Sequence, residues 1–219
     1  MPMNYRRLSS GRSNRLTLFF LGWGFDANAM GRMWLPDNTL ALWDYADMTL
    51  PPEVFDPQWE ALDIIAWSMG VWAVEECIRL HPNLPWGRRC AIGGTPLPCD
   101  NYFGIGRRLC LATATTWNEE NRHKFNLRMC DSKEALEKAK PLLGQRTVAN
   151  QKDELLKIVE MSANASQHPR MMWDAAFIGL QDNIFPVAGQ RDYWLKWAYS
   201  IIMVEMPHWP FDHIQTIVH

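Results

Sequence analysis

An apolar run that passes directly into a helix through a serine constrains the fold of this chain most strongly. Residues 62–66 (LDIIA) predict a buried strand, and residues 71–80 carry apolar side chains at helical spacing. Only residues 67–70 (WSMG) separate the two segments. A strand joined so tightly to a helix is typical of a parallel sheet that is covered by helices.

The rest of the chain alternates apolar runs with helical patterns in the same way. This alternation predicts an α/β fold with a mostly parallel central sheet flanked by helices. The length of 219 residues and the apolar share of 47% predict a single domain over residues 1–219. The predicted strands cover residues 16–21, 40–43, 62–66, 90–92, 175–178 and 200–204.

Strand signals are absent between about residues 96 and 170, where the pattern becomes mostly helical. Residues 131–134 (DSKE) have the pattern of a capping box with the acidic residue first, and they predict a helix that stops near Pro141. A second helix is predicted at about residues 153–161. We expect this segment to form a helical lid inserted between the strands.

Ser68 has the setting of a catalytic nucleophile. In the G-x-S-x-G turn, a serine between a strand and a helix projects its hydroxyl above the sheet. Gly70 matches the second glycine, and Ala66 stands at the first as a mild departure, because alanine has the smallest side chain after glycine. Such a short pattern also arises by chance, so the turn alone does not establish a hydrolase.

Asp182 and His208 complete a catalytic triad with Ser68. In α/β-hydrolases the nucleophile is followed along the chain by an acid and then by a histidine, each after a strand. Asp182 follows the strand at 175–178, and His208 follows the last strand. A turn formed by an Asp–Asn pair is the alternative reading of Asp182. The rival acids and bases, which lie before a strand, in a predicted helix or near the C-terminus, are Asp174, Asp192, His213 and His219.

Two backbone amides have the setting of an oxyanion hole. The N–H of Met69 opens the helix, where unpaired amides favour negative charge. The N–H of Trp23, in the glycine-flanked loop after the first strand, is placed to supply the second donor. A glycine turn with a core tryptophan explains the same loop without a function.

The charge and the cysteines limit the remaining classes of function. A formal charge of −2 excludes a protein that holds nucleic acid through overall positive charge. No apolar run reaches the roughly 20 residues that cross a bilayer. The five irregularly spaced cysteines indicate neither a zinc site nor a disulfide framework. We therefore expect a cytoplasmic protein without a cofactor, a metal, a nucleic acid or a membrane as partner.

Residues 6–29 imitate a signal peptide, but cleavage there would remove the first predicted strand.

The chain resembles the BioG-type pimeloyl-[acyl-carrier protein] methyl ester esterases of biotin synthesis. The resemblance covers most of the chain, except that residues 111–172 match loosely. Alanine in place of the first glycine of the serine turn is itself a feature of this family. The motifs that carry the resemblance are FLGWG (20–24), WDYAD (43–47), AWSMGVW (66–72), GTPLPCD (94–100), FGI (103–105) and PHW (207–209).

This resemblance implies an esterase that acts on a pimeloyl methyl ester carried by acyl carrier protein. Ser68 would attack the ester, His208 would take its proton, and the amides of Trp23 and Met69 would hold the oxyanion. A carrier-independent carboxylesterase or thioesterase is the first alternative. A catalytically inactive α/β-hydrolase that acts as a binding protein is the second.

The predicted lid suggests how such a carrier would be recognised. Acyl carrier proteins are acidic, and residues 101–146 hold nine basic against five acidic residues, a formal +4. Solvated helix faces with Glu–Lys pairs would give the same excess. The candidate docking residues, which we expect to be free of such pairs, are Arg107, Arg108, Arg122, Lys124 and Arg128. The candidates for an apolar lid underside that receives the acyl chain are Phe103, Trp117, Phe125 and Met129.

Overall fold

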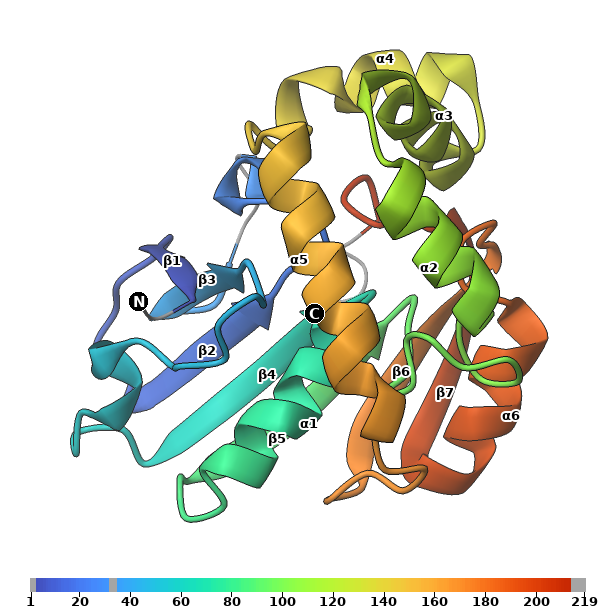
Figure 1. Cartoon of the computed structure of the whole chain (residues 1–219). Coiled ribbons are helices and arrows are strands. Elements are labelled where there is room, and N and C mark those ends of the chain that lie inside the picture. The colour runs from blue at the N-terminus through green and yellow to red at the C-terminus, as the bar shows by residue number, and fades with distance from the viewer. Residues whose placement is uncertain (1–2, 32–34, 214–219) are drawn as a thin grey trace.

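A single seven-stranded sheet forms the centre of the computed structural model, which describes residues 3–31 and 35–213 (Figure 1). The strands are β1 (Asn4–Arg7), β2 (Arg15–Phe20), β3 (Thr39–Trp43), β4 (Ala61–Trp67), β5 (Trp86–Ile92), β6 (Trp173–Gln181) and β7 (Ala198–Pro207). Their spatial order is β1-β3-β2-β4-β5-β6-β7. Strand β1 is antiparallel to β3, whereas every other neighbouring pair is parallel. The predicted α/β class and mostly parallel sheet are confirmed.

All six predicted strands are present, and the structure adds β1, which the sequence did not indicate. Every residue of β1 is exposed, and its sequence NYRR has no apolar alternation. The strand forms at the edge of the sheet because its backbone pairs with β3. By contrast, β4 is buried along almost its whole length, which is why its apolar run was readable.

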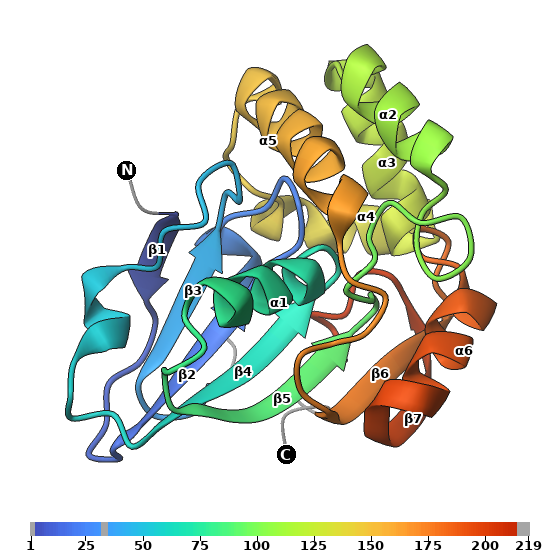
Figure 2. The same ribbon diagram turned by 60° about the horizontal axis from the view of Figure 1, so that its bottom comes forward.

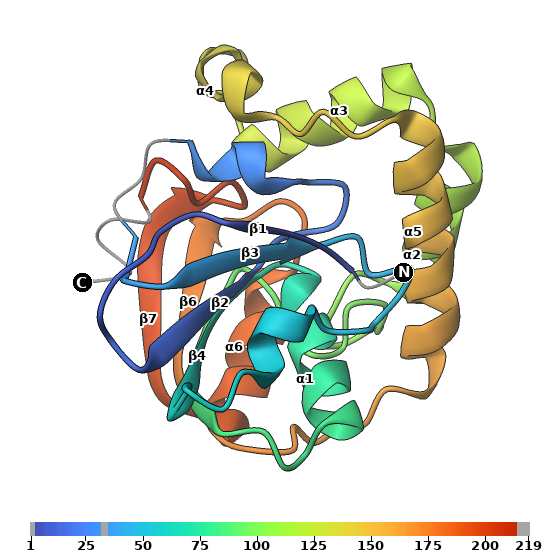
Figure 3. The ribbon, with the colours of Figure 1, turned by 90° about the vertical axis from the view of Figure 1, so that its left-hand side faces the viewer.

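Helices cover the sheet and extend beyond the carboxyl ends of its strands. The longer helices are α1 (Gly70–Leu80), α2 (Arg107–Thr116), α3 (Glu119–Cys130), α4 (Lys133–Ala139), α5 (Val148–Met161) and α6 (Val187–Trp197). Four 3-10 turns are η1 (Ala27–Met30), η2 (Pro52–Phe55), η3 (Lys140–Leu142) and η4 (Ser162–Asn164). Figure 3 shows α1 and α5 on the same side of the sheet. In the part of the chain that the structure describes, no helix is long and apolar enough to cross a membrane.

The segment between β5 and β6 holds α2, α3, α4 and α5, so its predicted helical character is correct. Helix α2 packs beside α5 (Figure 2), while α3 and α4 lie at the top of the molecule in Figure 1. We call residues 107–164 the helical insertion.

Two details of the insertion differ from the predictions. Helix α4 is capped by Ser132, whose hydroxyl accepts from the backbone N–H of Ala135, and not by Asp131. Asp131 instead ends α3 with a φ of 67°. Helix α5 begins at Val148, earlier than predicted, because Thr147 caps it by accepting from the N–H of Asn150.

Candidate active site

Ser68 lies in a strained turn between β4 and α1. Its φ is 58°, in the left-handed region that residues other than glycine rarely adopt. Space around the turn requires small residues. A Cβ added to Gly70 would lie 2.5 Å from the carbonyl oxygen of Phe20. Ala66, at the position of the first glycine, is completely buried in β4.

The structure brings Ser68, His208 and Asp182 together from three loops at the carboxyl ends of the strands. His208 Nε2 is 2.9 Å from Ser68 Oγ, and His208 Nδ1 is 2.9 Å from Asp182 Oδ2. All three side chains are buried. When Nδ1 carries the ring proton, it donates to Asp182 and leaves Nε2 free to accept from the serine hydroxyl.

Asp182 is held by three donors besides His208. Its Oδ1 accepts from the backbone N–H groups of Ile184 and Phe185, at 2.8 and 2.9 Å. Its Oδ2 also accepts from Gln190 Nε2 at 3.1 Å. Gln190 is completely buried in α6, and no motif in the sequence indicated it. These bonds fix the carboxylate that orients the histidine.

The rival acids and bases lie elsewhere or outside the described residues. Asp174, at the amino end of β6, accepts from the backbone N–H of Arg89. Asp192 lies in α6 and pairs with Arg191. His213 is in a turn after β7, and His219 is outside the described residues.

Trp23 and Met69, the two residues whose amides were predicted to bind an oxyanion, both line the cavity at Ser68. Neither backbone N–H donates a hydrogen bond to any residue that the structure describes. Trp23, Met69 and Ser68 line one cavity. Both amides are therefore available to an oxygen atom bound next to the serine.

The cavity at Ser68 is very small. Its volume is about 10 Å³, roughly the room that one water molecule needs. Phe125 and Met129, two of the expected acyl contacts, line it, together with Ile105 and Ile184, which were not predicted. Its complete lining is Gly22, Trp23, Phe25, Trp67, Ser68, Met69, Ile105, Phe125, Met129, Ile184 and His208.

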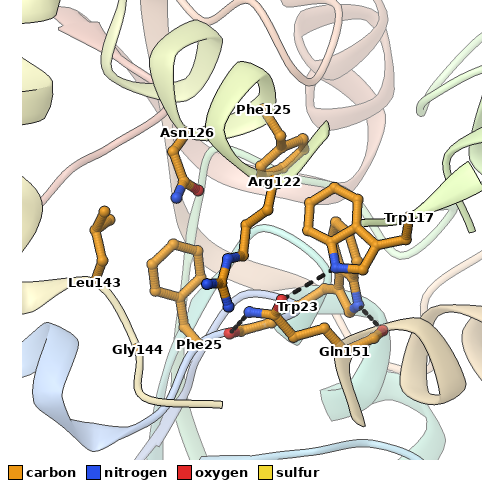
Figure 4. Close-up of a pocket in the computed structure, with 10 residues that line it drawn as sticks. Trp23, Phe25, Trp117, Arg122, Phe125, Asn126, Leu143, Gly144 and Gln151 are labelled. Carbon is orange, nitrogen blue, oxygen red and sulfur yellow. Dashed lines mark hydrogen bonds between the residues drawn. The ribbon is translucent and has the colours of Figure 1, made fainter. Parts of the chain in front are cut away.

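A second pocket of about 120 Å³ adjoins this cavity (Figure 4). Trp23, Phe25 and Phe125 line both spaces, so the two spaces lie next to each other. Trp117 lines the second pocket and packs on Trp23 with a centroid distance of 4.6 Å. Phe103, the remaining expected acyl contact, lines neither space, because its ring packs against Tyr193.

The five candidate docking residues do not share one environment. Arg107 and Arg108 are exposed in the first turn of α2, and Arg128 is exposed on α3. Among the described residues, none of these three has an ion-pair partner. The expectation was wrong for the other two. Arg122 pairs with Glu119 and Lys124 pairs with Glu120, at helical spacing along α3.

A mostly parallel sheet with a strained serine turn, and with a histidine–aspartate pair within hydrogen-bond distance of that serine, defines an α/β-hydrolase. The lipase-esterase related protein from Clostridium acetobutylicum has this fold, with a TM-score of 0.68 at 12% identity and coverage of 100% of this chain and 97% of that one. A family model described as "Pimeloyl-ACP methyl esterase BioG" matches residues 3–217. The chain belongs to this family of carboxylic ester hydrolases, which confirms the resemblance found in the sequence.

Two relatives, from Haemophilus influenzae and Bacteroides fragilis, match most of the chain. The crystal structure of BioG from Haemophilus influenzae has a TM-score of 0.84 at 29% identity, covering 96% of this chain and 95% of that one. A protein of Bacteroides fragilis named malonyl-[acyl-carrier protein] O-methyltransferase is 32% identical over 193 residues. The match covers 88% of this chain but only 39% of that protein.

Proposed function

We propose that the chain hydrolyses the methyl ester of pimeloyl-[acyl-carrier protein] to the free carboxylate and methanol, in biotin biosynthesis. Membership of the BioG family supports the ester as substrate. The observation that carries the chemistry is the continuous hydrogen-bonded chain from Ser68 through His208 to Asp182. The same chain of contacts counts against a catalytically inactive binding protein.

The first half of the reaction forms an acyl-enzyme. Ser68 Oγ attacks the ester carbonyl carbon while His208 Nε2 takes the hydroxyl proton. Asp182 stabilises the imidazolium that results. When the tetrahedral intermediate collapses, His208 returns the proton to the leaving oxygen, and methanol departs.

The second half releases the product. A water molecule gives its proton to His208 Nε2 and attacks the acyl carbon, and collapse of the second intermediate frees Ser68 and the carboxylate. In both intermediates the negative oxygen accepts from the amides of Trp23 and Met69. The N-terminus of α1, which follows Met69, adds a favourable dipole.

The carrier supplies the selectivity between two acyl bonds. The substrate contains a methyl ester at one end and a thioester to the carrier's prosthetic arm at the other. A docked carrier holds the thioester outside while the far end reaches Ser68. The name of the Bacteroides fragilis relative, an O-methyltransferase for a carrier-bound acyl group, supports a carrier-bound methyl ester as the type of substrate.

Methanol release tests this proposal. We expect hydrolysis of the carrier-bound methyl ester at a much lower KM than that of the same ester without the carrier. Equal kinetic constants for both would instead indicate a carrier-independent carboxylesterase. Release of the acyl chain from the carrier would indicate a thioesterase.

Phe125→Ala is expected to raise kcat/KM for a small soluble ester. Phe125 lines both the cavity at Ser68 and the second pocket, so the substitution should enlarge the space beside the serine. Phe103→Ala is the matched control, because this half-buried ring packs on Tyr193 and lines neither space. Similar changes in both variants would count against Phe125 as the barrier to the site.

Reversing the charge of Arg107 and Arg108 is expected to raise KM for the carrier-bound ester. The helix dipole disfavours cations in the first turn of α2, so helix stability does not explain these two arginines. Rim charges act mainly on association and its salt dependence. Arg107→Glu/Arg108→Glu should therefore flatten the dependence of kcat/KM on ionic strength, and it should leave a carrier-free methyl ester unaffected.

The matched control for this variant is Arg88→Glu/Lys196→Glu. It makes the same change in charge, but Arg88 lies in the first part of β5 and Lys196 just before β7, away from the carboxyl ends where Ser68 lies. Equal effects of the two double variants on KM would show a general charge effect rather than docking at α2.

A further inference from the structure

Helix α5 of the insertion holds the loop that carries Trp23 through two buried side chains. Gln151 Nε2 donates to the carbonyl oxygen of Gly24 at 2.8 Å, and the carbonyl oxygen of Gln151 accepts from Trp23 Nε1 at 2.7 Å. Figure 4 shows both bonds. One turn further along α5, Glu154 accepts from the backbone N–H of Gly24 at 3.1 Å. Both polar groups of the Gly24 backbone are thus bonded to α5.

These bonds leave one amide of the loop free beside the serine. The N–H of Gly24 is bonded to Glu154, and the N–H of Phe25 is bonded to the carbonyl oxygen of Gly22. The N–H of Trp23 has no acceptor among the described residues, and Trp23 lines the cavity at Ser68. The contacts from α5 therefore hold the loop in the conformation that presents this donor.

Glu154 is a charged group in a completely buried position. Burial raises the pKa of its carboxyl group, and the charge of Arg146, 2.6 Å away, opposes that rise. Its second oxygen accepts from the backbone N–H of Tyr45 at 2.9 Å. Buried ion pairs contribute little to stability, because apolar residues in their place often give a protein of equal stability. The hydrogen bond from Glu154 to the loop of Trp23 therefore explains the buried carboxylate better than a contribution to the stability of the fold does.

The contacts of Glu154 also require a carboxylate rather than an amide. Each of its two oxygens accepts from a backbone N–H, one in the Trp23 loop and one at Tyr45. Glutamine has only one acceptor atom, and Arg146 donates to the same oxygen of Glu154 that accepts from Gly24. A glutamine would therefore keep its oxygen at that position and lose the bond from Tyr45, whereas alanine removes the bond to Gly24 as well.

We propose that Glu154 and Gln151 are positioning residues for ester hydrolysis, which hold the N–H of Trp23 toward the oxyanion through Gly24. This inference rests on the proposed function. Neither side chain needs to touch the substrate. Loss of one oxyanion donor lowers kcat by about 10²–10³-fold in other hydrolases, which sets the scale of the expected effect.

Glu154→Ala tests the proposal, with Glu75→Ala as the matched control. Glu75 is also a buried glutamate whose pKa is raised by burial, but it accepts from the N–H of Arg170 and from Trp173 Nε1, away from the loop. The measurements are kcat and KM for a p-nitrophenyl ester, the inhibition constant of a trifluoromethyl ketone that adds to Ser68, and Tm.

We expect Glu154→Ala to lower kcat by about 10²-fold, as for loss of an oxyanion donor, with little change in KM. It should weaken the trifluoromethyl ketone by a similar factor, because that inhibitor forms the oxyanion. Glu75→Ala should lower Tm without either effect. An unchanged kcat in Glu154→Ala, or equal losses of kcat in both variants, would overturn the proposal.

Gln151→Ala keeps the proposal testable if Glu154→Ala does not fold. It removes the bond to the Gly24 carbonyl and the bond that Gln151 Oε1 accepts from Trp117 Nε1. It leaves the buried ion pair and the backbone bond to Trp23 in place. We expect a smaller loss of kcat, again at nearly constant KM, and normal kinetics here would contradict a positioning role for Gln151. Hydrolysis of the same ester by the unsubstituted chain tests the proposed esterase activity separately from the positioning role.

Discussion

Replacing Ser68 with alanine is expected to abolish ester hydrolysis and to leave the fold intact. The substitution removes Ser68 Oγ, which lies 2.9 Å from His208 Nε2, and it keeps the Cβ, so no core volume is lost. Loss of the nucleophile in a serine hydrolase costs about 10⁶-fold in kcat. The measurements are methanol release, Tm, and labelling by a fluorophosphonate, which should modify Ser68 in the unsubstituted chain.

Ser9→Ala provides the control for removing a serine hydroxyl. Ser9 is partly buried and donates to the carbonyl oxygen of Pro36, remote from the site in the sequence and in its contacts. This variant should keep its activity and its labelling. Substantial hydrolysis by Ser68→Ala, or labelling at another residue, would contradict the assignment of the nucleophile.

Asp182→Asn is expected to lower kcat by about 10⁴-fold without unfolding the chain. The amide oxygen would keep the bonds from Ile184 and Phe185, so its NH2 group would face His208 Nδ1. That contact favours the tautomer with the proton on Nε2, which cannot accept from Ser68. The loss should appear in kcat for carrier-bound and carrier-free esters alike.

Asp174→Asn is the matched control for this prediction. Asp174 lies at the opposite end of the same strand and accepts from the N–H of Arg89. We expect at most a moderate loss of stability and a normal kcat. A large loss of kcat in Asp174→Asn, with normal activity in Asp182→Asn, would reverse the assignment of the acid.

The sequence predicted the parts of this molecule that depend on local pattern. The serine turn, Asp182 and His208 each follow a strand whose apolar residues mark it in the sequence, and the carboxyl ends of parallel strands meet at one edge of a sheet. Strand β1 has no such pattern and exists because of its pairing with β3. The pairs of Arg122 with Glu119 and of Lys124 with Glu120 were visible as helical spacing, but the limits of α3 were not.

Contacts between distant segments could not be predicted. Gln190 reaches Asp182 only because α6 packs beside the loop after β6, and Glu154 reaches Gly24 only because α5 lies against the loop after β2. Both are ordinary helical residues in the sequence. The small cavity at Ser68 likewise takes its lining from distant segments, which include Ile105, Phe125 and Ile184.

The mass of the intact carrier protein after incubation with the chain tests the proposed reaction most directly. Pimeloyl-[acyl-carrier protein] methyl ester is the substrate, and Ser68→Ala is the control. Hydrolysis of the methyl ester should lower the mass of the carrier by that of one methylene group, with the acyl chain still attached and with no change in the control. Loss of the whole acyl group, or an unchanged mass with the active chain, would contradict the proposed function.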